Sequence, residues 1–253
     1  MSTRALRVAS AGLALALFVS SGCASTGDAD QRRLSVLAAS SLTDAFSTLA
    51  ARFERTHGVD VRLSFAGSSS LAQQVVDGAP GDVVATADQE SMALVSDAGL
   101  AATDPTLFAT NTLVIVTPRD NPAGITTVRS LADPDVSVAL CAPEVPCGRA
   151  AADVLRVDRV QITPVTLEPD VRSVLAKVRL GEVDAGIVYV TDARSAGSEV
   201  RTVPLRNAAT VVSRYPLAAL RSASEPVLAR QFVRLVLSPA GQQVLHREGF
   251  GTP

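Results

Sequence analysis

The sequence predicts an α/β protein made of two lobes with a cleft between them. Strand and helix patterns alternate three times between residues 34 and 99, which is typical of a sheet with parallel strands. A second alternating block spans residues 112–190, and extended segments at 200–204 and 210–220 follow it. The last two helical patterns, at 225–247, are expected to return to the first lobe. We therefore expect lobe 1 to comprise residues 34–112 and 214–253, and lobe 2 to comprise residues 113–213.

Composition narrows the function classes. The chain has 253 residues, of which 47% are hydrophobic, enough for one large core or two smaller ones. Its formal net charge is -2, so nothing favours a nucleic-acid surface. Tryptophan is absent and aromatic residues make up 4% of the chain, which argues against stacking platforms for bases or sugars.

The N-terminus reads as an export signal rather than as part of the fold. Arg4 and Arg7 precede an uncharged, apolar stretch at 8–20, and Cys23 follows it. We expect residues 1–22 to be a signal peptide, Cys23 to carry a lipid, and residues 23–33 to be a polar tether. Ser20 stands where a lipoprotein signal usually has leucine, so a secreted protein without lipid and an uncleaved anchor stay open as alternatives.

The first block begins with a buried strand at 34–39. Ser41 is expected to cap a helix that ends at Gly58, because its apolar residues recur at helical spacing. A strand with one wetter face follows at 59–65. After the serine turn at 67–70, the chain predicts a second helix, a strand at 82–87, and a third helix capped by Asp88.

The second block repeats this alternation. Besides a helix near Gly148, which the second strand reaches through a long turn, this block contains five predicted strands or helices. They are strands at 112–117, 136–141, 161–165 and 184–190, and a helix at 171–180 that Gly181 ends.

The sequence contains little that indicates an enzyme active site. His57 and His246 have no Cys, Asp or Glu at metal-ligand spacing, so we expect neither a bare metal ion nor a resident cofactor. A nucleophilic Cys147 would need a nearby base that the sequence does not supply. The interpretation that we favour is a binding protein and not an enzyme.

Two serine turns point instead to an anion. Ser40 and Ser41 follow one predicted strand, and Ser68 and Ser69 follow the next. Serine is a common helix cap, so each turn alone says little. Together they place hydroxyls and helix N-termini at the carboxyl ends of strands in one sheet, where ligands of open α/β sheets bind. The turns at 145–148 and 169–171 offer two more helix N-termini, whose useful groups would be backbone N–H.

Cys141 and Cys147 support a second hypothesis. In an exported protein a disulfide between them is plausible, and two separate reduced cysteines are the alternative. An exported thiol enzyme that uses both residues is the rival from a different function class.

Six segments in order resemble the periplasmic molybdate-binding proteins of ABC importers, over roughly residues 34–253. They are V-L-A-A-S-S-L-T-D-A-F, F-A-G-S-S-S-L-A-Q-Q-V, G-A-P-G-D-V-V-A-T-A-D-Q, V-P-C-G-R, D-V-R and G-I-V-Y-V-T-D-A. The resemblance implies a two-lobed type II periplasmic-binding-protein fold with the ligand in the cleft. With the expected lipid on Cys23, we expect a monomer anchored on the outer face of the cytoplasmic membrane or in the periplasm.

The resemblance further implies the ligand and its contacts. Molybdate, and tungstate as well, would be captured and passed to a membrane permease driven by a cytoplasmic ATPase. The oxyanion would be bound by Ser41, Ser68, the N–H groups of Cys147 and Val171, and the Tyr189 hydroxyl. Ser40 and Ser69 are additional candidates, because the resemblance leaves open which adjacent serine binds. Sulfate or another tetrahedral oxyanion is the alternative ligand, since a sequence does not measure a cavity.

Three positions depart from the family pattern. Ser40 stands where the family more usually has alanine, Gly67 where serine is common, and Cys147 where alanine is common. None of these changes removes a predicted contact.

Overall fold

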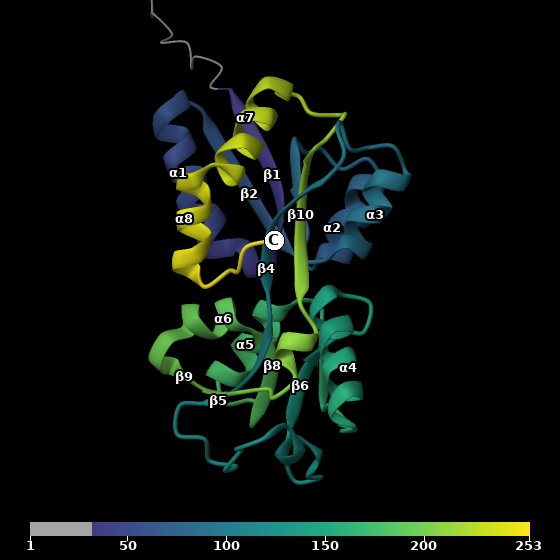
Figure 1. Cartoon of the computed structure of the whole chain (residues 1–253), viewed down its shortest axis with the longest axis vertical. Coiled ribbons are helices and arrows are strands. Elements are labelled where there is room, and N and C mark those ends of the chain that lie inside the picture. The colour runs from purple at the N-terminus through teal and green to yellow at the C-terminus, as the bar shows by residue number, and fades with distance from the viewer. Residues whose placement is uncertain (1–31) are drawn as a thin grey trace, which may run out of the picture. The chain divides into compact units, whose positions relative to one another are not determined.

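The structure is a computed structural model that describes residues 32–253. The predicted signal peptide, the lipidation site Cys23 and most of the predicted tether lie outside these residues (Figure 1). Within the described part of the chain, no helix is both long enough and apolar enough to cross a bilayer.

The first sheet has five strands in the order β2-β1-β3-β10-β4. They are β1 (Arg33–Ala39), β2 (Asp60–Ala66), β3 (Val83–Ala85), β4 (Thr106–Asn111) and β10 (Ser213–Ala219). β2, β1 and β3 are parallel, as the alternation predicts, but β10 runs antiparallel between β3 and β4. The sheet is therefore mixed, and the chain returns from residue 213 to complete it.

The second sheet has the order β7-β6-β8-β5-β9. Its strands are β5 (Leu113–Pro118), β6 (Val138–Cys141), β7 (Thr166–Glu168), β8 (Ala185–Tyr189) and β9 (Val200–Val203). It is also mixed, since β6 runs parallel to β7 and β8 while β5 runs antiparallel to β8 and β9.

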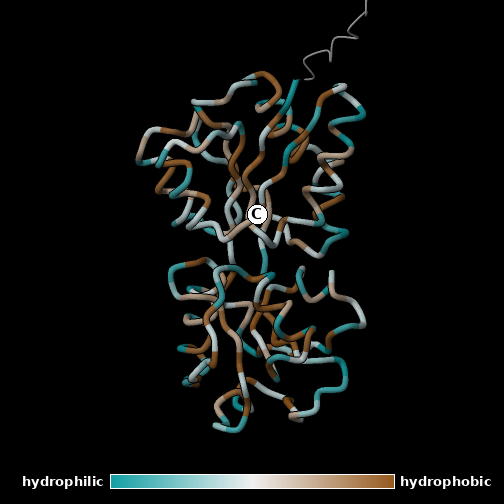
Figure 2. Tube along the Cα trace, turned by 180° about the vertical axis from the view of Figure 1, so that it is seen from behind, coloured by the Kyte–Doolittle hydropathy of each residue, from teal (hydrophilic) through white to brown (hydrophobic). Residues whose placement is uncertain are grey.

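Helices cover both faces of the first sheet (Figure 1). They are α1 (Thr43–His57), α2 (Ser68–Val76), α3 (Gln89–Asp97), α7 (Pro226–Leu237) and α8 (Pro239–Glu248). Along β1, side chains alternate between the faces. Val36 belongs to the core that holds Phe46 of α1 and Phe232 of α7, whereas Leu37 packs with Leu71 of α2. Figure 2 shows hydrophobic residues running along the strands, as this double burial requires.

The helices of the second sheet are α4 (Pro146–Asp158), α5 (Val171–Arg179) and α6 (Val190–Ala196). α5 lies close on β8 because Gly186 has no side chain. A Cβ atom there would lie 2.6 Å from Cγ1 of Val174. Short 3₁₀ turns complete the fold at Ser40–Leu42, Val128–Ala132, Gly197–Glu199 and Ala208–Thr210.

The structure corrects one predicted strand and adds two elements. The strand predicted at 161–165 is wrong, because the ladder with β6 begins only at Thr166. Pro164 lacks an N–H to donate to that ladder. The sequence pattern also missed β4 and the seven-residue helix α6.

The chain crosses between the sheets at Thr112, directly between β4 and β5. Asn111 pairs with Ser213 at the end of the first sheet, and Leu113 pairs with Tyr189 in the second. A second crossing connects β9 to β10. The crossings therefore bring residues of both sheets into contact.

Candidate functional site

One small cavity collects the predicted site residues from five separate segments. The centre of a water molecule can occupy about 10 Å³ of it, comparable with the space that one ordered water needs. Segments of the first sheet supply one wall and segments of the second sheet supply the other. The lining comprises Ala39, Ser40, Ser41, Ala66, Gly67, Ser68, Ala87, Val145, Pro146, Cys147, Asp170, Val171 and Tyr189.

All five residues predicted as primary contacts line this cavity, and Ser40 lies beside them. Ser69 is outside the lining, and its hydroxyl donates to the carbonyl oxygen of Glu144. That these groups bind an anion stays a prediction at this point.

Helix N-termini provide the backbone donors of the cavity. Ser68 and Val171 are the first residues of α2 and α5, and Cys147 is the second residue of α4. The first N–H groups of a helix have no partner within the helix and carry partial positive charge. The cavity therefore offers N–H groups from three helix starts to a negative ligand.

The prediction that Ser41 caps α1 is wrong. Residues Ser40–Leu42 form a 3₁₀ turn, α1 begins at Thr43, and no side chain caps either start. The Ser41 hydroxyl is instead 2.9 Å from the hydroxyl of Tyr215. It is therefore free of any role in helix capping.

The hydroxyls of Ser68 and Tyr189 also have partners behind the wall. The backbone N–H of Ala87 donates to Oγ of Ser68 at 2.9 Å. The hydroxyl of Ser213 donates to that of Tyr189 at 3.3 Å. Both contacts are buried, so they hold these side chains in place without filling the cavity side of their oxygens.

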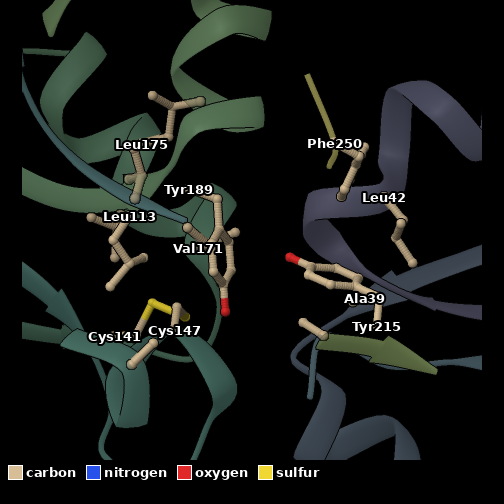
Figure 3. Close-up of a cluster of buried hydrophobic side chains, with 14 of the residues drawn as sticks. Ala39, Leu42, Leu113, Cys141, Cys147, Val171, Leu175, Tyr189, Tyr215 and Phe250 are labelled. Carbon is tan, nitrogen blue, oxygen red and sulfur yellow. A yellow bond between two sulfur atoms is a disulfide. The ribbon is translucent and has the colours of Figure 1, made fainter. Parts of the chain in front are cut away.

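Tyr189 and Tyr215 stay protonated under any ordinary condition. Burial raises the pKa of each phenol, and the hydrogen bonds of Tyr189 with Ser213 and of Tyr215 with Ser41 only partly oppose this shift. Their ring centroids are 6.0 Å apart, and Figure 3 shows the Tyr215 hydroxyl pointing towards Tyr189. Both side chains therefore present neutral O–H groups.

Sequence reasoning missed Tyr215. The residue lies 174 positions after Ser41, so no local pattern connects the two. One signal was available: a tyrosine within a buried strand pattern needs a hydrogen-bond partner for its hydroxyl.

The carboxylate of Asp170, the acidic residue in the lining, already accepts hydrogen bonds from its own helix. Asp170 caps α5, because its Oδ1 accepts from the N–H groups of Arg172 and Ser173 and its Oδ2 accepts from the Ser173 hydroxyl. Its carboxylate thus faces its own helix, and the polar groups offered to a ligand are mainly donors.

Two arginines of the second lobe connect it to the first beside the cavity. Arg149, in the first turn of α4, lies 2.6 Å from Oδ2 of Asp88 and 3.3 Å from Oε2 of Glu90. It also donates to the hydroxyl of Ser91 at 3.1 Å. This contact holds the start of α4 against the start of α3.

Arg172, in the first turn of α5, makes the second connection. Its guanidinium bonds Asp44 of α1, and its Nε lies 2.7 Å from Oδ1 of Asp192 as a charge contact rather than an aligned hydrogen bond. Asp192 is fully buried, and burial raises its pKa while the positive charge of Arg172 opposes the shift. The two arginine contacts together hold the lobes close around the cavity.

Gly67 permits a close approach of the lobes at the cavity edge. A Cβ atom at this position would lie 2.4 Å from the carbonyl oxygen of Pro169 and 3.3 Å from Cγ1 of Val145, both in the second lobe. The backbone of Gly67 is extended, with φ of -61°. The glycine is therefore needed for space across the cleft and not for an unusual backbone conformation.

The two cysteines lie side by side behind the cavity (Figure 3). Their sulfur atoms are 2.06 Å apart, and both side chains are buried. They join the end of β6 to the first turn of α4, so they brace the loop that presents the Cys147 N–H.

A family model described as bacterial extracellular solute-binding protein matches residues 34–251. The chain therefore belongs to the family of bacterial extracellular solute-binding proteins. It is 44% identical over 223 residues to the molybdate-binding protein ModA of Mycobacterium tuberculosis. That match covers 88% of this chain and 85% of the relative.

Two solved structures share the fold, each at 20% sequence identity. The periplasmic molybdate-binding protein of Azotobacter vinelandii matches with a TM-score of 0.73, over 87% of this chain and 99% of that one. The sulfate-binding protein SubI of M. tuberculosis matches with a TM-score of 0.74, over 87% of this chain and 86% of that one. The predicted two-lobed periplasmic-binding-protein fold is thus confirmed.

Proposed function

We propose that this protein captures molybdate outside the cytoplasm and delivers it to an ABC importer. The observation that carries the proposal is the cavity: five residues predicted from separate motifs line one small space that is rich in hydrogen-bond donors. The 44% identical relative named as a molybdate-binding protein supports the same ligand. Tungstate, an oxyanion of the same charge and shape, belongs to the proposal as a second ligand.

The proposed contacts are three hydroxyls and two backbone groups. They come from Ser41, Ser68 and Tyr189, and from the N–H groups of Cys147 and Val171. Ser40 is an additional candidate. Helix N-termini balance the charge of the anion without a cationic side chain in the cavity lining.

Selection against protonated anions follows from this donor set. A fully ionised tetrahedral oxyanion accepts hydrogen bonds at every oxygen, whereas hydrogen phosphate also needs an acceptor for its own proton. The Asp170 carboxylate is a poor acceptor for it, because three hydrogen bonds from α5 already occupy the group. Size is the remaining criterion between molybdate and sulfate.

The other predictions from the sequence belong to the same proposal. The lobes divide at residues 112–113 and 213–214 and close on the anion, and the closed form, a monomer, docks on the permease. Residues 1–22 direct export, Cys23 carries the lipid anchor, and residues 23–33 are the tether. In the oxidising compartment outside the cytoplasm, Cys141 and Cys147 form a disulfide.

Calorimetric titration of the full chain with molybdate tests the proposal. We expect tight one-to-one binding that survives excess sulfate, and binding of tungstate at the same site. Displacement by sulfate would make the protein a sulfate binder. Absence of heat with all three anions would refute an oxyanion function and favour the exported thiol enzyme.

Two variants test the site. The double variant Ser41→Ala, Ser68→Ala should weaken molybdate binding by about 10²- to 10⁴-fold, because each lost hydrogen bond to a charged group is worth about 1.5–3 kcal/mol. Ser70→Ala is the matched control, since this exposed serine lies on the same turn of α2. Unchanged affinity in the double variant would refute the site assignment.

A further inference from the structure

Three of the hydroxyls that line the cavity, those of Ser41, Ser68 and Tyr189, accept or can accept a hydrogen bond from a protein group behind them. Ser68 accepts from the N–H of Ala87, and Tyr189 accepts from the hydroxyl of Ser213. A hydroxyl has a single proton, so an oxygen that already accepts from behind can direct that proton forwards. For Ser41 the direction depends on Tyr215, because either of these two hydroxyls can donate to the other.

Asn111 favours one direction of the Ser41–Tyr215 bond. Its side-chain oxygen faces the backbone N–H of Thr112 at 3.0 Å, so the oxygen must be the acceptor and the NH₂ group must point the other way. The NH₂ group then donates to the hydroxyls of Thr191 at 2.9 Å and Tyr215 at 3.4 Å. The Tyr215 oxygen thus accepts from Asn111, which favours donation of its own proton to Ser41 over acceptance of a second hydrogen bond.

We propose that Tyr215 is a positioning residue that fixes the Ser41 hydroxyl as a hydrogen-bond donor to the bound anion. The relay runs from the Asn111 amide through the Tyr215 hydroxyl to Ser41 and on to the cavity. This inference rests on the proposed function and adds a residue outside the cavity lining. It explains how the proton of Ser41 is directed towards the cavity before the anion arrives.

The residues around Tyr215 hold its side chain in place, and they allow its hydroxyl to be removed without loss of the ring contacts. The side chain is fully buried, and its ring packs edge-on against Phe108 and Phe250, with centroids 6.3 and 5.4 Å away. Tyr215→Phe keeps these ring contacts and removes only the hydroxyl. Burial raises the pKa of this hydroxyl, so the wild-type group does not lose its proton near neutral pH.

A double-mutant cycle with molybdate distinguishes positioning from a general structural role. Tyr215→Phe should weaken binding by about tenfold in the otherwise native chain, which corresponds to one buried hydrogen bond. In the Ser41→Ala background the same substitution should change affinity less than twofold, because the group through which Tyr215 acts is gone. Thr117→Val, which removes another buried hydroxyl, is the control and should leave affinity unchanged.

Asn111→Asp is a second variant for this experiment, and it remains usable if Tyr215→Phe fails to fold. The carboxylate would accept the Tyr215 proton and force Ser41 to donate to Tyr215 instead of to the anion. Repulsion between this carboxylate and the anion weakens binding in both backgrounds, whereas reversal of the relay weakens it only where Ser41 is present. We therefore expect a larger loss with Ser41 than with Ala at that position.

The outcomes separate this inference from the proposed function. Equal losses in both backgrounds, or no loss from Tyr215→Phe, would overturn the positioning role while wild-type binding kept the function intact. A wild-type protein that binds no molybdate would overturn both.

Discussion

Gly67→Ala should leave the fold intact and yet weaken anion binding. The added Cβ atom would lie 2.4 Å from the carbonyl oxygen of Pro169 in the opposite lobe, where ordinary contacts begin at 3.4 Å. The two backbone segments must therefore separate by about 1 Å, a change of the size that overpacking forces on a packed core. Overpacking costs about 1–3 kcal/mol, so the dissociation constant for molybdate should rise by about 5- to 150-fold.

The stability of the ligand-free protein should change little. Alanine readily adopts the extended backbone of Gly67, so the substitution adds no strain within the first lobe. Alanine is a poorer helix cap than glycine but restricts the unfolded chain more, and these two effects of about 1 kcal/mol oppose each other. A large fall in the melting temperature would mean that the substitution damages the fold rather than the closure.

Calorimetry and small-angle scattering measure the two parts of this prediction. We expect weaker binding of molybdate by Gly67→Ala and a smaller compaction on binding than in wild type. Ser70→Ala is the control on the same turn. Affinity and compaction equal to those of wild type would show that the bound lobes do not meet at Gly67 and Pro169, and would refute the reasoning.

Three further predictions concern stability. Cys141→Ser should lower the free energy of unfolding by about 2 kcal/mol if a disulfide closes the six-residue separation to Cys147, and reductant should then destabilise wild type but not the variant in urea titrations. Burial alone would raise the pKa of Asp44, but the hydrogen bond and charge of Arg172 outweigh burial and lower it below 3.8. This carboxylate therefore stabilises the fold above pH 3.8 and loses its effect as the pH falls through the lowered pKa. Asp44→Asn should cost at most about 1 kcal/mol at pH 7, because the group is partly exposed, and should reduce the loss of stability in acid; equal acid limbs would contradict this. Phe232→Ala should cost about 3–5 kcal/mol in urea unfolding, since its fully buried ring packs against Phe53, and a loss below 1 kcal/mol would argue against that core.

Local patterns were sufficient for most elements of the fold. The apolar spacing of α1 predicts the buried face that includes Phe46 and Phe53, and Gly58 ends the helix in a left-handed conformation as expected. Asp88 caps α3, as its position before the helix indicates. These features depend on neighbours within one or two turns, so the sequence alone carries them.

Elements whose apolar residues show no clear helix or strand periodicity were harder to predict. β4 has only three buried residues among six, and α6 has seven residues, too few for a helical pattern to stand out. The antiparallel place of β10 between β3 and β4 depends on long-range pairing that no local pattern reports.

The cavity was predictable in its residues but not in its supports. The serine turns and helix starts follow strands, so their meeting at one edge could be inferred. The roles of Arg149, Arg172 and Tyr215 could not, because each acts on a residue far away in the chain. Arg149 lies 61 positions from Asp88, and Arg172 lies 128 positions from Asp44.

The place of β10 has a consequence for the order of folding. Every strand of the second sheet lies within residues 113–203, so that sheet can form as soon as this stretch is available. β4 has β10 as its sheet neighbour, and β10 begins about a hundred residues after β4 ends. Closing so long a loop is slow, and it must wait for the chain to reach residue 219. Because Tyr215 lies on β10, we expect the part of the cavity wall behind Ser41 to be among the last to fold. The wall that the second sheet supplies should form before it.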